Sequence, residues 1–244
     1  MTCKDKVAIV TGSAGKGMGR SIALTLAREG AKVAVNYRTS KERAQTIVNH
    51  IKNRNGNAIA VKADVFEADG CRNLVDSTIE RFGRIDICIV NPGAGWHPEP
   101  IDMLNSIDAI EDLHHEVAPF LHLMPLVLPQ MYKRKWGRVI GIGLLPPYNS
   151  PAYSYNVAKT ARTEALLCAR DEAWHNGVTI NVIGPGPVSA IESLTEAIEQ
   201  CDHGPAWQNR TNTSPQDIAE SVAFLCTDAG RFVTGCVLPF LFHP

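Results

Sequence analysis

The stretch of residues 7–19 constrains the fold most strongly, because it joins an apolar run to an amphipathic segment through a glycine-rich loop. Residues 7–10 read Val-Ala-Ile-Val, as expected of a parallel strand buried on both faces, and apolar residues recur at helical spacing from Ile22 onward. Without a Cβ, Gly12, Gly17 and Gly19 permit a tight turn and let backbone amides approach a pyrophosphate at the positive end of the helix. The stretch therefore predicts a nucleotide-binding loop, with a simple strand-to-helix turn as the alternative.

The rest of the chain repeats strand and helix in even steps. Strands are predicted at about residues 32–38, 58–63, 85–90, 138–142 and 179–183, and helices at about 39–53, 69–82, 106–131, 151–176 and from Ser214 onward. Prolines at 119, 125 and 129 predict that the helix at 106–131 is kinked or split. The alternation dictates a parallel sheet with right-handed crossovers, and hence an α/β fold.

Composition and charge exclude several classes of partner. The chain has 244 residues, of which 45% are hydrophobic and 20% charged, as in soluble globular proteins. A net charge of -1 gives no electrostatic reason to expect nucleic acid or an anionic membrane as partner. The seven cysteines include no CxxC pair, so we expect free thiols and no metal site. Since no apolar run resembles a signal core or a membrane span, we expect a cytoplasmic protein.

The residues at the end of the second predicted strand should determine the preference between NAD and NADP, because they lie beside the adenosine ribose in a dinucleotide-binding fold. An acidic residue there would accept hydrogen bonds from the ribose of NAD and repel a 2′-phosphate. This chain instead has Asn36 and Arg38, with Lys16 in the glycine loop as a second cation, which favours NADP over NAD. Taken singly, either cation could be a solvated surface charge. Asp64, after the third strand, could contact the adenine amino group or cap the next helix.

Tyr155 and Lys159 carry the predicted chemistry. Four residues apart on a helix, the two side chains share a face, so the ammonium should favour the ionised phenol and lower its pKa. In the reduction of a carbonyl, Tyr155 would donate a proton to the oxygen while Lys159 holds the nicotinamide ribose hydroxyls. Taken alone, the pair could be an aromatic residue and a lysine on any surface helix. Together with the preceding strand, the glycine loop and the Pro185-Gly186 turn, it predicts catalytic residues or their vestige.

Six motifs together carry a family resemblance. They are Thr11-Gly12 with Gly17-Met18-Gly19, Asp64-Val65, the Asn91 loop, Tyr155-x-x-x-Lys159, Asn-Val-Ile-Gly-Pro-Gly at 181–186, and Thr234-Gly235. Over nearly its whole length the chain resembles the short-chain dehydrogenase/reductase family, and most closely its 3-oxoacyl-(acyl carrier protein) reductase-like branch. The resemblance implies one Rossmann-like, doubly wound domain with a seven-stranded parallel sheet, a nicotinamide cofactor, a carbonyl or acyl-thioester substrate and a homodimer or homotetramer.

The motifs and strand ends give a set of candidate cofactor-binding residues. They are Gly12, Ser13, Lys16, Gly17, Met18, Gly19, Asn36, Arg38, Asp64, Val65, Asn91, Pro92, Gly93, Tyr155, Lys159, Pro185, Gly186 and Val188. A polar stretch at about residues 189–213 is expected to form a lid over the substrate.

The chain departs from the family pattern at the reaction centre. The serine that polarises the carbonyl in similar proteins falls at Leu144 or Gly143, and Tyr148, Asn149 or Ser150 could replace it. The family asparagine that supports a proton-relay water falls at His115 or Glu116.

Three further departures lie outside the reaction centre. Four residues instead of three separate Gly12 from Gly17, and Pro92 removes a backbone donor from the Asn91 loop. The chain also ends in an apolar run at 240–244, which would pack in a subunit interface.

Two other functions remain open. A protein of this fold that has lost efficient catalysis could serve as a cofactor-binding or structural partner. An enoyl-type reductase is the other alternative, although its tyrosine-to-lysine spacing is wider than the four residues found here.

Overall fold

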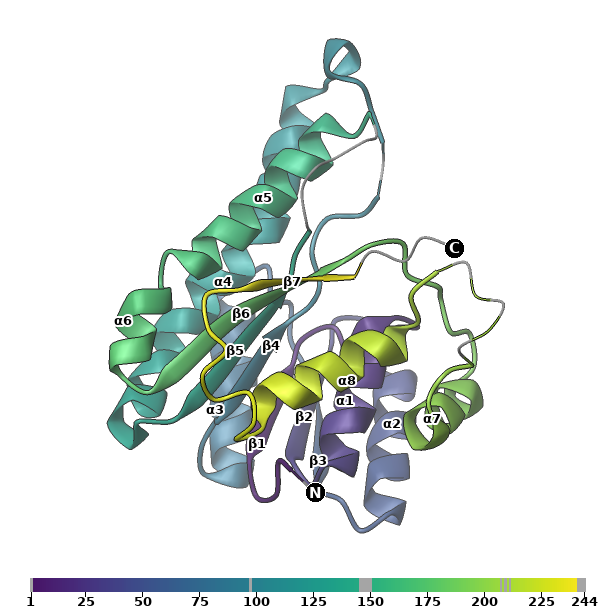
Figure 1. Ribbon diagram of the computed structural model, residues 1–244, viewed down its shortest axis with the longest axis vertical. Coiled ribbons are helices and arrows are strands. Elements are labelled where there is room, and N and C mark those ends of the chain that lie inside the picture. Colours follow the sequence, from purple (N-terminus) through teal and green to yellow (C-terminus); the bar gives the residue numbers. More distant parts are fainter. Residues whose placement is uncertain are drawn as a thin grey trace.

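The protein is a seven-stranded parallel sheet with helices on both faces (Figure 1). The structure, a computed structural model, describes residues 2–96, 98–144, 151–206, 208, 210 and 212–240. The strand order is β3-β2-β1-β4-β5-β6-β7. The strands are β1 (Val7–Val10), β2 (Lys32–Tyr37), β3 (Ala58–Lys62), β4 (Ile87–Val90), β5 (Gly137–Ile142), β6 (Val178–Pro185) and β7 (Val237–Phe240). The expected Rossmann-like fold is confirmed, and the order reverses between β1 and β4, where such folds place their ligands.

The helices divide between the two faces of the sheet. They are α1 (Met18–Arg28), α2 (Lys41–Asn53), α3 (Ala68–Phe82), α4 (Ser106–Arg134), α5 (Tyr153–Leu167), α6 (Arg170–His175), α7 (Leu194–His203) and α8 (Pro215–Cys226), with a short 3-10 turn at Ile101–Met103. Helices α1, α2, α7 and α8 share one buried apolar cluster with the sheet, and α3 to α6 share the other.

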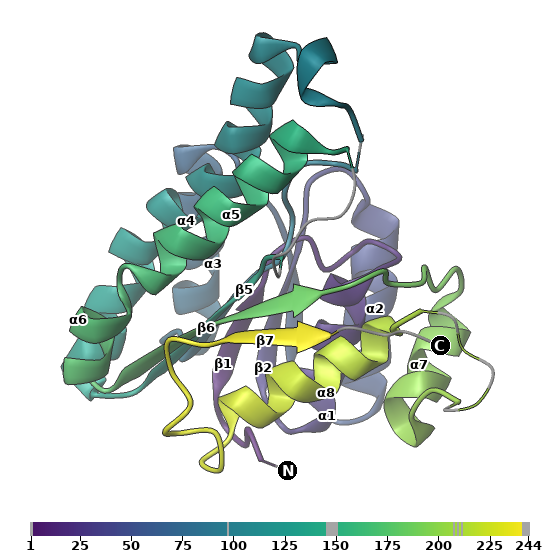
Figure 2. The ribbon, with the colours of Figure 1, turned by 45° about the horizontal axis from the view of Figure 1, so that its top comes forward.

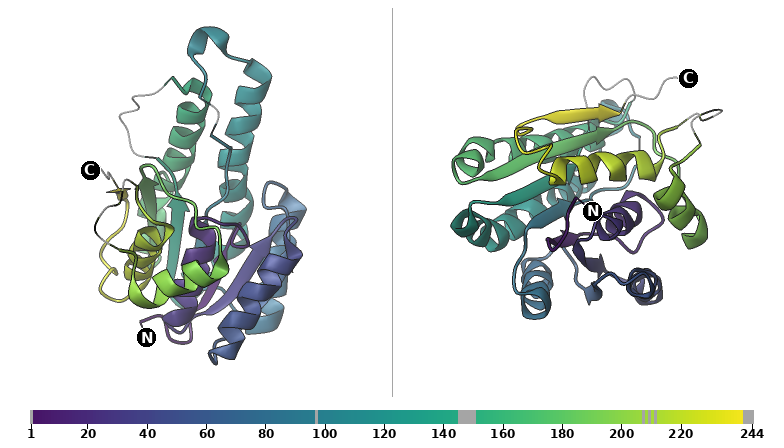
Figure 3. Two further views of the ribbon diagram at one scale, coloured as in Figure 1. Left: turned by 90° about the vertical axis from the view of Figure 1, so that its right-hand side faces the viewer. Right: turned by 60° about the horizontal axis from the view of Figure 1, so that its bottom comes forward.

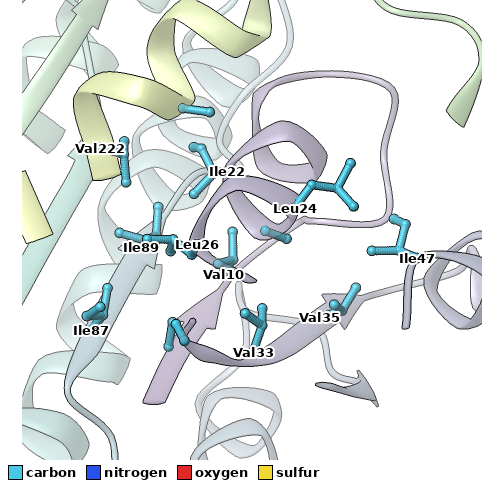
Figure 4. Close-up of a cluster of buried hydrophobic side chains, with 14 of the residues drawn as sticks. Val10, Ile22, Leu24, Leu26, Val33, Val35, Ile47, Ile87, Ile89 and Val222 are labelled. Carbon is cyan, nitrogen blue, oxygen red and sulfur yellow. The ribbon is translucent and has the colours of Figure 1, made fainter. Parts of the chain in front are cut away.

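The first cluster shows how apolar periodicity becomes packing. Ile22 and Leu26 of α1 and Val222 of α8 lie close to Ile87 and Ile89 of β4, and all five side chains are buried (Figure 4). Each such side chain contributes about 1.5–3 kcal/mol relative to leaving it in water. The packing fixes α1 on the sheet, and with it the position of the glycine loop at its N-terminus.

Helices α4 and α5 lie side by side and extend beyond the sheet (Figures 2 and 3). The alternative that prolines split the first of these helices is wrong, since α4 runs unbroken through Pro119, Pro125 and Pro129. An interior proline costs a helix about 3 kcal/mol, and burial of Phe120 and Leu123 opposes that cost. No described helix is long and apolar enough to cross a membrane.

The single helix expected at 151–176 is also wrong. The helix stops at Leu167 and a separate α6 begins at Arg170, although neither intervening residue is glycine or proline. Packing decides this break, because Ala173 of α6 is fully buried in the second apolar cluster and the chain must bend to bring it there. Local propensity therefore gives way to tertiary contacts.

Candidate active site

In the glycine loop between β1 and α1, the first and last glycines lie in close contact. Gly12 has a φ of +59°, which favours glycine, and the ring of Pro92 packs against it. A Cβ on Gly19 would lie 2.7 Å from the carbonyl oxygen of Gly12. By contrast, a Cβ on Gly17 would meet nothing within 4 Å, and no side chain caps α1, which begins at Met18. The loop thus leaves open space beside Gly17 at the N-terminus of α1, the kind of position at which helices of other proteins bind phosphates.

Ser13 and Asn36 hold this loop from inside the protein. The Oδ1 atom of Asn36 accepts a hydrogen bond from the amide of Gly12 at 2.9 Å, and its Nδ2 donates to the carbonyl of Ala63 at 3.0 Å. The hydroxyl of Ser13 donates to the carbonyl of Val10 at 2.7 Å and accepts from the amide of Asn36 at 3.0 Å. Both side chains are buried, so their polar groups stabilise the loop itself.

The two candidate cations each lie beside a carboxylate. Lys16 forms an exposed ion pair with Glu192, from the segment that follows β6. The guanidinium of Arg38 is largely exposed and lies 3.8 Å from the carboxylate of Asp64. Asp64 does not cap α3, whose N-cap residue is Glu67, so the capping alternative is wrong. Exposed pairs of this kind are weak and can be displaced by a phosphate.

The remaining candidate residues follow other strand ends. Val65, the residue after Asp64, is buried. The amide of Asn91 donates to the hydroxyl of Thr11 at 2.9 Å, which fastens the loop after β4 to β1. Pro185 ends β6, and the amide of Gly186 donates to Phe240 of β7 at 2.8 Å. Val188 pairs with Thr213 in an isolated parallel bridge.

Tyr155 and Lys159 both lie on α5, next to the loop that follows β4. The Nζ atom of Lys159 lies 5.5 Å from the centroid of the Tyr155 ring, and the Trp96 ring meets Tyr155 edge-on at 4.9 Å between centroids. The ammonium is 2.9 Å from Oε1 of Glu116 on α4. The expected juxtaposition of phenol and amine is therefore present, with a carboxylate beside the amine.

Glu116 connects three parts of the site. Besides Lys159, its carboxylate accepts a hydrogen bond from NH1 of Arg162 at 2.7 Å and from the amide of Ala94 at 2.8 Å. The NH2 group of Arg162 donates to the carbonyl of Pro92, also at 2.7 Å. Gly93 has its Cα against the Glu116 carboxylate, which leaves no room for a Cβ. Glu116 and Arg162 have no solvent exposure, so this is a buried ionic network.

The protonation of Tyr155 differs from the expectation. Burial, with a smaller contribution from Glu116, raises the pKa of Tyr155 to about 12, and Arg162 acts in the opposite direction. Burial and the nearby Arg162 lower the pKa of Lys159 to about 8, while Glu116 opposes that shift. The expectation of a lowered pKa for Tyr155 is thus not met, because burial of the phenol outweighs the effect of the nearby cations.

The structure bears on both positions at which the chain departs from the family pattern, those of the asparagine and the serine. Glu116 reaches Lys159, whereas His115 packs its ring on Phe66 with centroids 4.5 Å apart. Gly143 has no room for a side chain, since a Cβ there would lie 2.6 Å from both the Thr163 hydroxyl and the Val182 side chain. Leu144 carries no hydroxyl. The proposed replacements Tyr148, Asn149 and Ser150 lie outside the described residues, as do positions 241–244 of the apolar tail.

Sequence reasoning missed Arg162 and Trp96. Arg162 lies three residues after Lys159, which is the other spacing that shares a helix face, so this signal was available. Trp96 stands in an irregular loop, where spacing predicts no contact. The described residues contain no cluster of three His, Cys, Asp or Glu side chains that could hold a metal ion.

A pocket of about 570 Å³ lies beside this site. It is lined by Gly95, Pro98, Glu99, Asp108, Glu111, Asp112, His115 and Ser154. Ser154 adjoins Tyr155 in the chain, and its hydroxyl donates to the carboxylate of Asp112 at 3.1 Å. The pocket is therefore large enough for a small molecule.

The strand order and the glycine loop define a Rossmann-like α/β protein, the class that binds dinucleotides at the carboxyl ends of its strands. The family model described as short chain dehydrogenase matches residues 6–200, and the chain belongs to this family.

Individual relatives agree with this assignment. The chain is 30% identical to the 3-oxoacyl-(acyl carrier protein) reductase FabG of Staphylococcus epidermidis over 240 residues, covering 95% of each chain. It is 33% identical to the 7alpha-hydroxysteroid dehydrogenase of Escherichia coli over 240 residues, covering 96% of this chain and 91% of that one. The resemblance to the 3-oxoacyl-(acyl carrier protein) reductases is thereby confirmed.

Solved structures show the same fold. A 7 alpha-hydroxysteroid dehydrogenase complexed with NADH and 7-oxo glycochenodeoxycholic acid superposes with a TM-score of 0.84 at 28% identity, covering 98% of this chain and 93% of that one. A short chain dehydrogenase from Burkholderia cenocepacia in complex with NADP gives a TM-score of 0.83 at 26% identity, covering 98% of both. Relatives of this chain thus bind either dinucleotide.

Proposed function

We propose that this protein is an NADP(H)-dependent oxidoreductase that reduces a carbonyl group, with Tyr155 as general acid/base and Lys159 as its partner. The observation that carries the proposal is the place of these side chains. They stand one helical turn apart on α5, beside the loop after β4, and Ser154, which precedes Tyr155 in the chain, lines a pocket of about 570 Å³. A phenol beside a pocket can donate a proton to an oxygen bound there.

The residues fit a dinucleotide. The open side of the loop at Gly17 and the uncapped N-terminus of α1 would hold the pyrophosphate, and Asn91 to Gly93 would line the nicotinamide end. Lys159 would hold the ribose hydroxyls. When bound, the cofactor supplies the hydride, and Tyr155 supplies the proton to the carbonyl oxygen.

The proposal is tested by the oxidation of NADPH with a panel of 3-oxoacyl thioesters and 7-oxo steroids, the substrate classes that the relatives' names suggest. Tyr155→Phe should reduce turnover about 100-fold or more, because the proton donor is lost. Tyr153→Phe is the matched control, since it makes the same change at an exposed position on the same helix. Equal turnover in the two variants would refute the catalytic role of Tyr155.

The preference for NADP rests on Arg38, whose exposed guanidinium stands after β2, and on Lys16 in the glycine loop. A 2′-phosphate can displace Asp64 from Arg38 and gain a charge-assisted hydrogen bond. Arg38→Asp should therefore weaken NADPH binding relative to NADH by about 10–100-fold, measured by fluorescence titration. The control is Arg72→Asp on the exposed face of α3. An unchanged ratio in Arg38→Asp would contradict the preference.

We also propose that residues 189–213 form a lid within a single domain. The segment contains α7, and its base is closed by the pairing of Val188 with Thr213. Its first residues contact the glycine loop, because the amide of Ile191 donates to the carbonyl of Lys16 at 3.1 Å. Slower amide hydrogen exchange in this segment on addition of NADPH would support a lid, and unchanged exchange would contradict it.

A homodimer or homotetramer is proposed from the exposed apolar side chains of the paired helices. Ile107, Ile110 and Leu121 of α4 are exposed, as are Tyr153 and Val157 of α5. Such a patch is costly in water and suits a symmetric interface. Sedimentation velocity gives the test, since a monomer at micromolar concentration would contradict the proposal.

A cytoplasmic location remains a proposal. All seven cysteines are free thiols, which suits a reducing compartment. Fractionation of the source cells would test this location.

A cofactor-binding protein with little turnover is the second candidate. The observation that favours it is Leu144, which offers no hydroxyl where relatives carry the serine that polarises the carbonyl. The loss of one such donor costs roughly 100–1000-fold in rate. Tight NADPH binding with no turnover on any substrate of the panel would support this candidate over the first.

A further inference from the structure

Two buried cations share one carboxylate behind the proposed catalytic tyrosine. Lys159 and Arg162 approach different oxygens of Glu116, at 2.9 Å and 2.7 Å. The Glu116 and Arg162 side chains have no solvent exposure, and that of Lys159 is 9% exposed. Water therefore screens these charges little, and each acts strongly on its neighbours.

The carboxylate is required for the two cations to be buried together. Desolvation disfavours every charged group in this region, and like charges three residues apart on a helix repel each other. Glu116 compensates both effects and also accepts a hydrogen bond from the amide of Ala94, in the loop proposed to line the nicotinamide. It thus fixes the amine of Lys159 and that loop together.

The charges around Tyr155 come from two helices. Lys159 and Arg162 stand on its own helix, while α4 contributes Glu116, with Asp112 and His115 nearby on the same helix. Asp112 accepts from Ser154, and the nearest ring from the loop after β4 is Trp96, which is uncharged. Burial has the largest effect on the pKa of Tyr155 and raises it, Glu116 raises it further, and Arg162 lowers it. A site with the two cations alone would favour tyrosinate, and Glu116 removes much of that effect.

We propose that Glu116 is a positioning residue that holds Lys159 and Arg162 and offsets their charge at Tyr155, so that the buried tyrosine stays a phenol and the site favours carbonyl reduction over alcohol oxidation. This inference rests on the proposed function. In reduction the carbonyl carbon gains a hydride from the nicotinamide, which is oxidised, and the oxygen gains the phenolic proton. The Tyr155 O–H bond breaks, and the tyrosinate regains a proton from water. Alcohol oxidation needs the tyrosinate first, which Glu116 disfavours.

The test measures the protonation of Tyr155 without any cofactor. Ultraviolet absorbance of tyrosinate is followed against pH, and the same background carrying Tyr155→Phe is subtracted. In Glu116→Gln the carboxylate is lost while Arg162 keeps its charge at the pH where Tyr155 titrates, so Tyr155 should ionise about 1–3 pH units lower than in wild type. Glu164→Gln makes the same change at an exposed position on α5, and should leave the titration unchanged.

A second variant separates charge from loosened packing. The double variant Glu116→Gln with Arg162→Met loses one charge of each sign, so Tyr155 should ionise at a pH between those of Glu116→Gln and wild type. Looser packing would instead place the double variant furthest from wild type. The proposal would be overturned if Tyr155 ionised at the same pH in Glu116→Gln as in wild type. It would also be overturned if, of wild type and the two variants, Tyr155 ionised at the lowest pH in the double variant. If Glu116→Gln does not fold, the double variant is compared with Arg162→Met, from which it differs only in the Glu116 charge. Tyr155 should then ionise at a lower pH in the double variant, and equal titrations would overturn the proposal.

Activity provides the link to the proposed function. In Glu116→Gln, the pH profile of alcohol oxidation by NADP should move down by the shift found in the titration. If Tyr155→Phe keeps full turnover, the proposed function fails while the titration result stands. If Tyr155→Phe loses turnover but Tyr155 titrates alike in wild type and Glu116→Gln, only the proposed role of Glu116 fails.

Discussion

Two parts of the proposed cofactor site, the glycine loop at one end and the surroundings of Lys159 at the other, are held together by different forces. At the glycine loop, Ser13 and Asn36 are buried and form neutral hydrogen bonds to Gly12, Val10 and Ala63. At the other end, a buried network of full charges joins Glu116, Lys159 and Arg162 across two helices.

The two ends differ in the free-energy cost of losing one interaction. A neutral hydrogen bond contributes about 1 kcal/mol and is almost independent of pH. A buried ionic network is costly to disrupt, because losing one partner leaves the others charged and unsolvated. It also responds to pH, because burial and Arg162 lower the pKa of Lys159 to about 8. The interactions at the glycine loop should therefore be nearly independent of pH, whereas those of the charged network should change with it.

The largest expected effect comes from breaking the charged end. Glu116→Leu leaves Lys159 and Arg162 buried without a counterion, so the free energy of unfolding should fall by about 3–5 kcal/mol, measured by urea denaturation. Adding Arg162→Met should recover much of the loss. Glu164→Leu, on the exposed face of α5, is the control and should change it by less than about 0.5 kcal/mol. A loss below about 1 kcal/mol in Glu116→Leu would mean that the network is not buried as described.

A smaller effect is expected at the neutral end. Asn36→Ala removes the partners of the Gly12 amide and the Ala63 carbonyl, so the free energy of unfolding should fall by about 1–3 kcal/mol in the same assay. Asn49→Ala, at an exposed position of α2, should lie within about 0.5 kcal/mol of wild type. A loss in Asn36→Ala as large as that in Glu116→Leu would remove the distinction between the two ends.

The smallest effect is a slope with pH. The pKa of Lys159 is about 8 in the folded protein and 10.5 ordinarily. Between these values the unfolded chain binds a proton that the folded protein lacks, so this lysine makes the free energy of unfolding rise with pH. The slope is at most about 1.4 kcal/mol per pH unit.

Lys159→Met should remove this rise, while Asn36→Ala should keep it. Urea denaturation at several values between pH 8 and 10.5 provides the measurement. Parallel curves for wild type and Lys159→Met would show that the lysine titrates normally.

Much of the fold follows from local patterns. Apolar runs of strand length, helical periodicity after Gly19 and punctuation by glycine and proline give the βα alternation, and right-handed crossovers then leave few topologies. One continuous helix over 151–176 and a split of α4 at its prolines were the wrong predictions, because burial of Ala173 and Phe120 opposes the local preferences. Such contacts join residues distant in sequence, which periodicity does not report.

The sequence by itself determined the sheet, the glycine loop and the spacing that puts Tyr155 and Lys159 on one helix face, because these depend on residues close together in the chain. Only the tertiary structure decided which charges surround them. Glu116 stands 46 residues before Arg162 and meets it only because α4 and α5 pack together. The protonation of a buried phenol depends on its solvation and on charges from every neighbouring element, so it is a property of the folded protein.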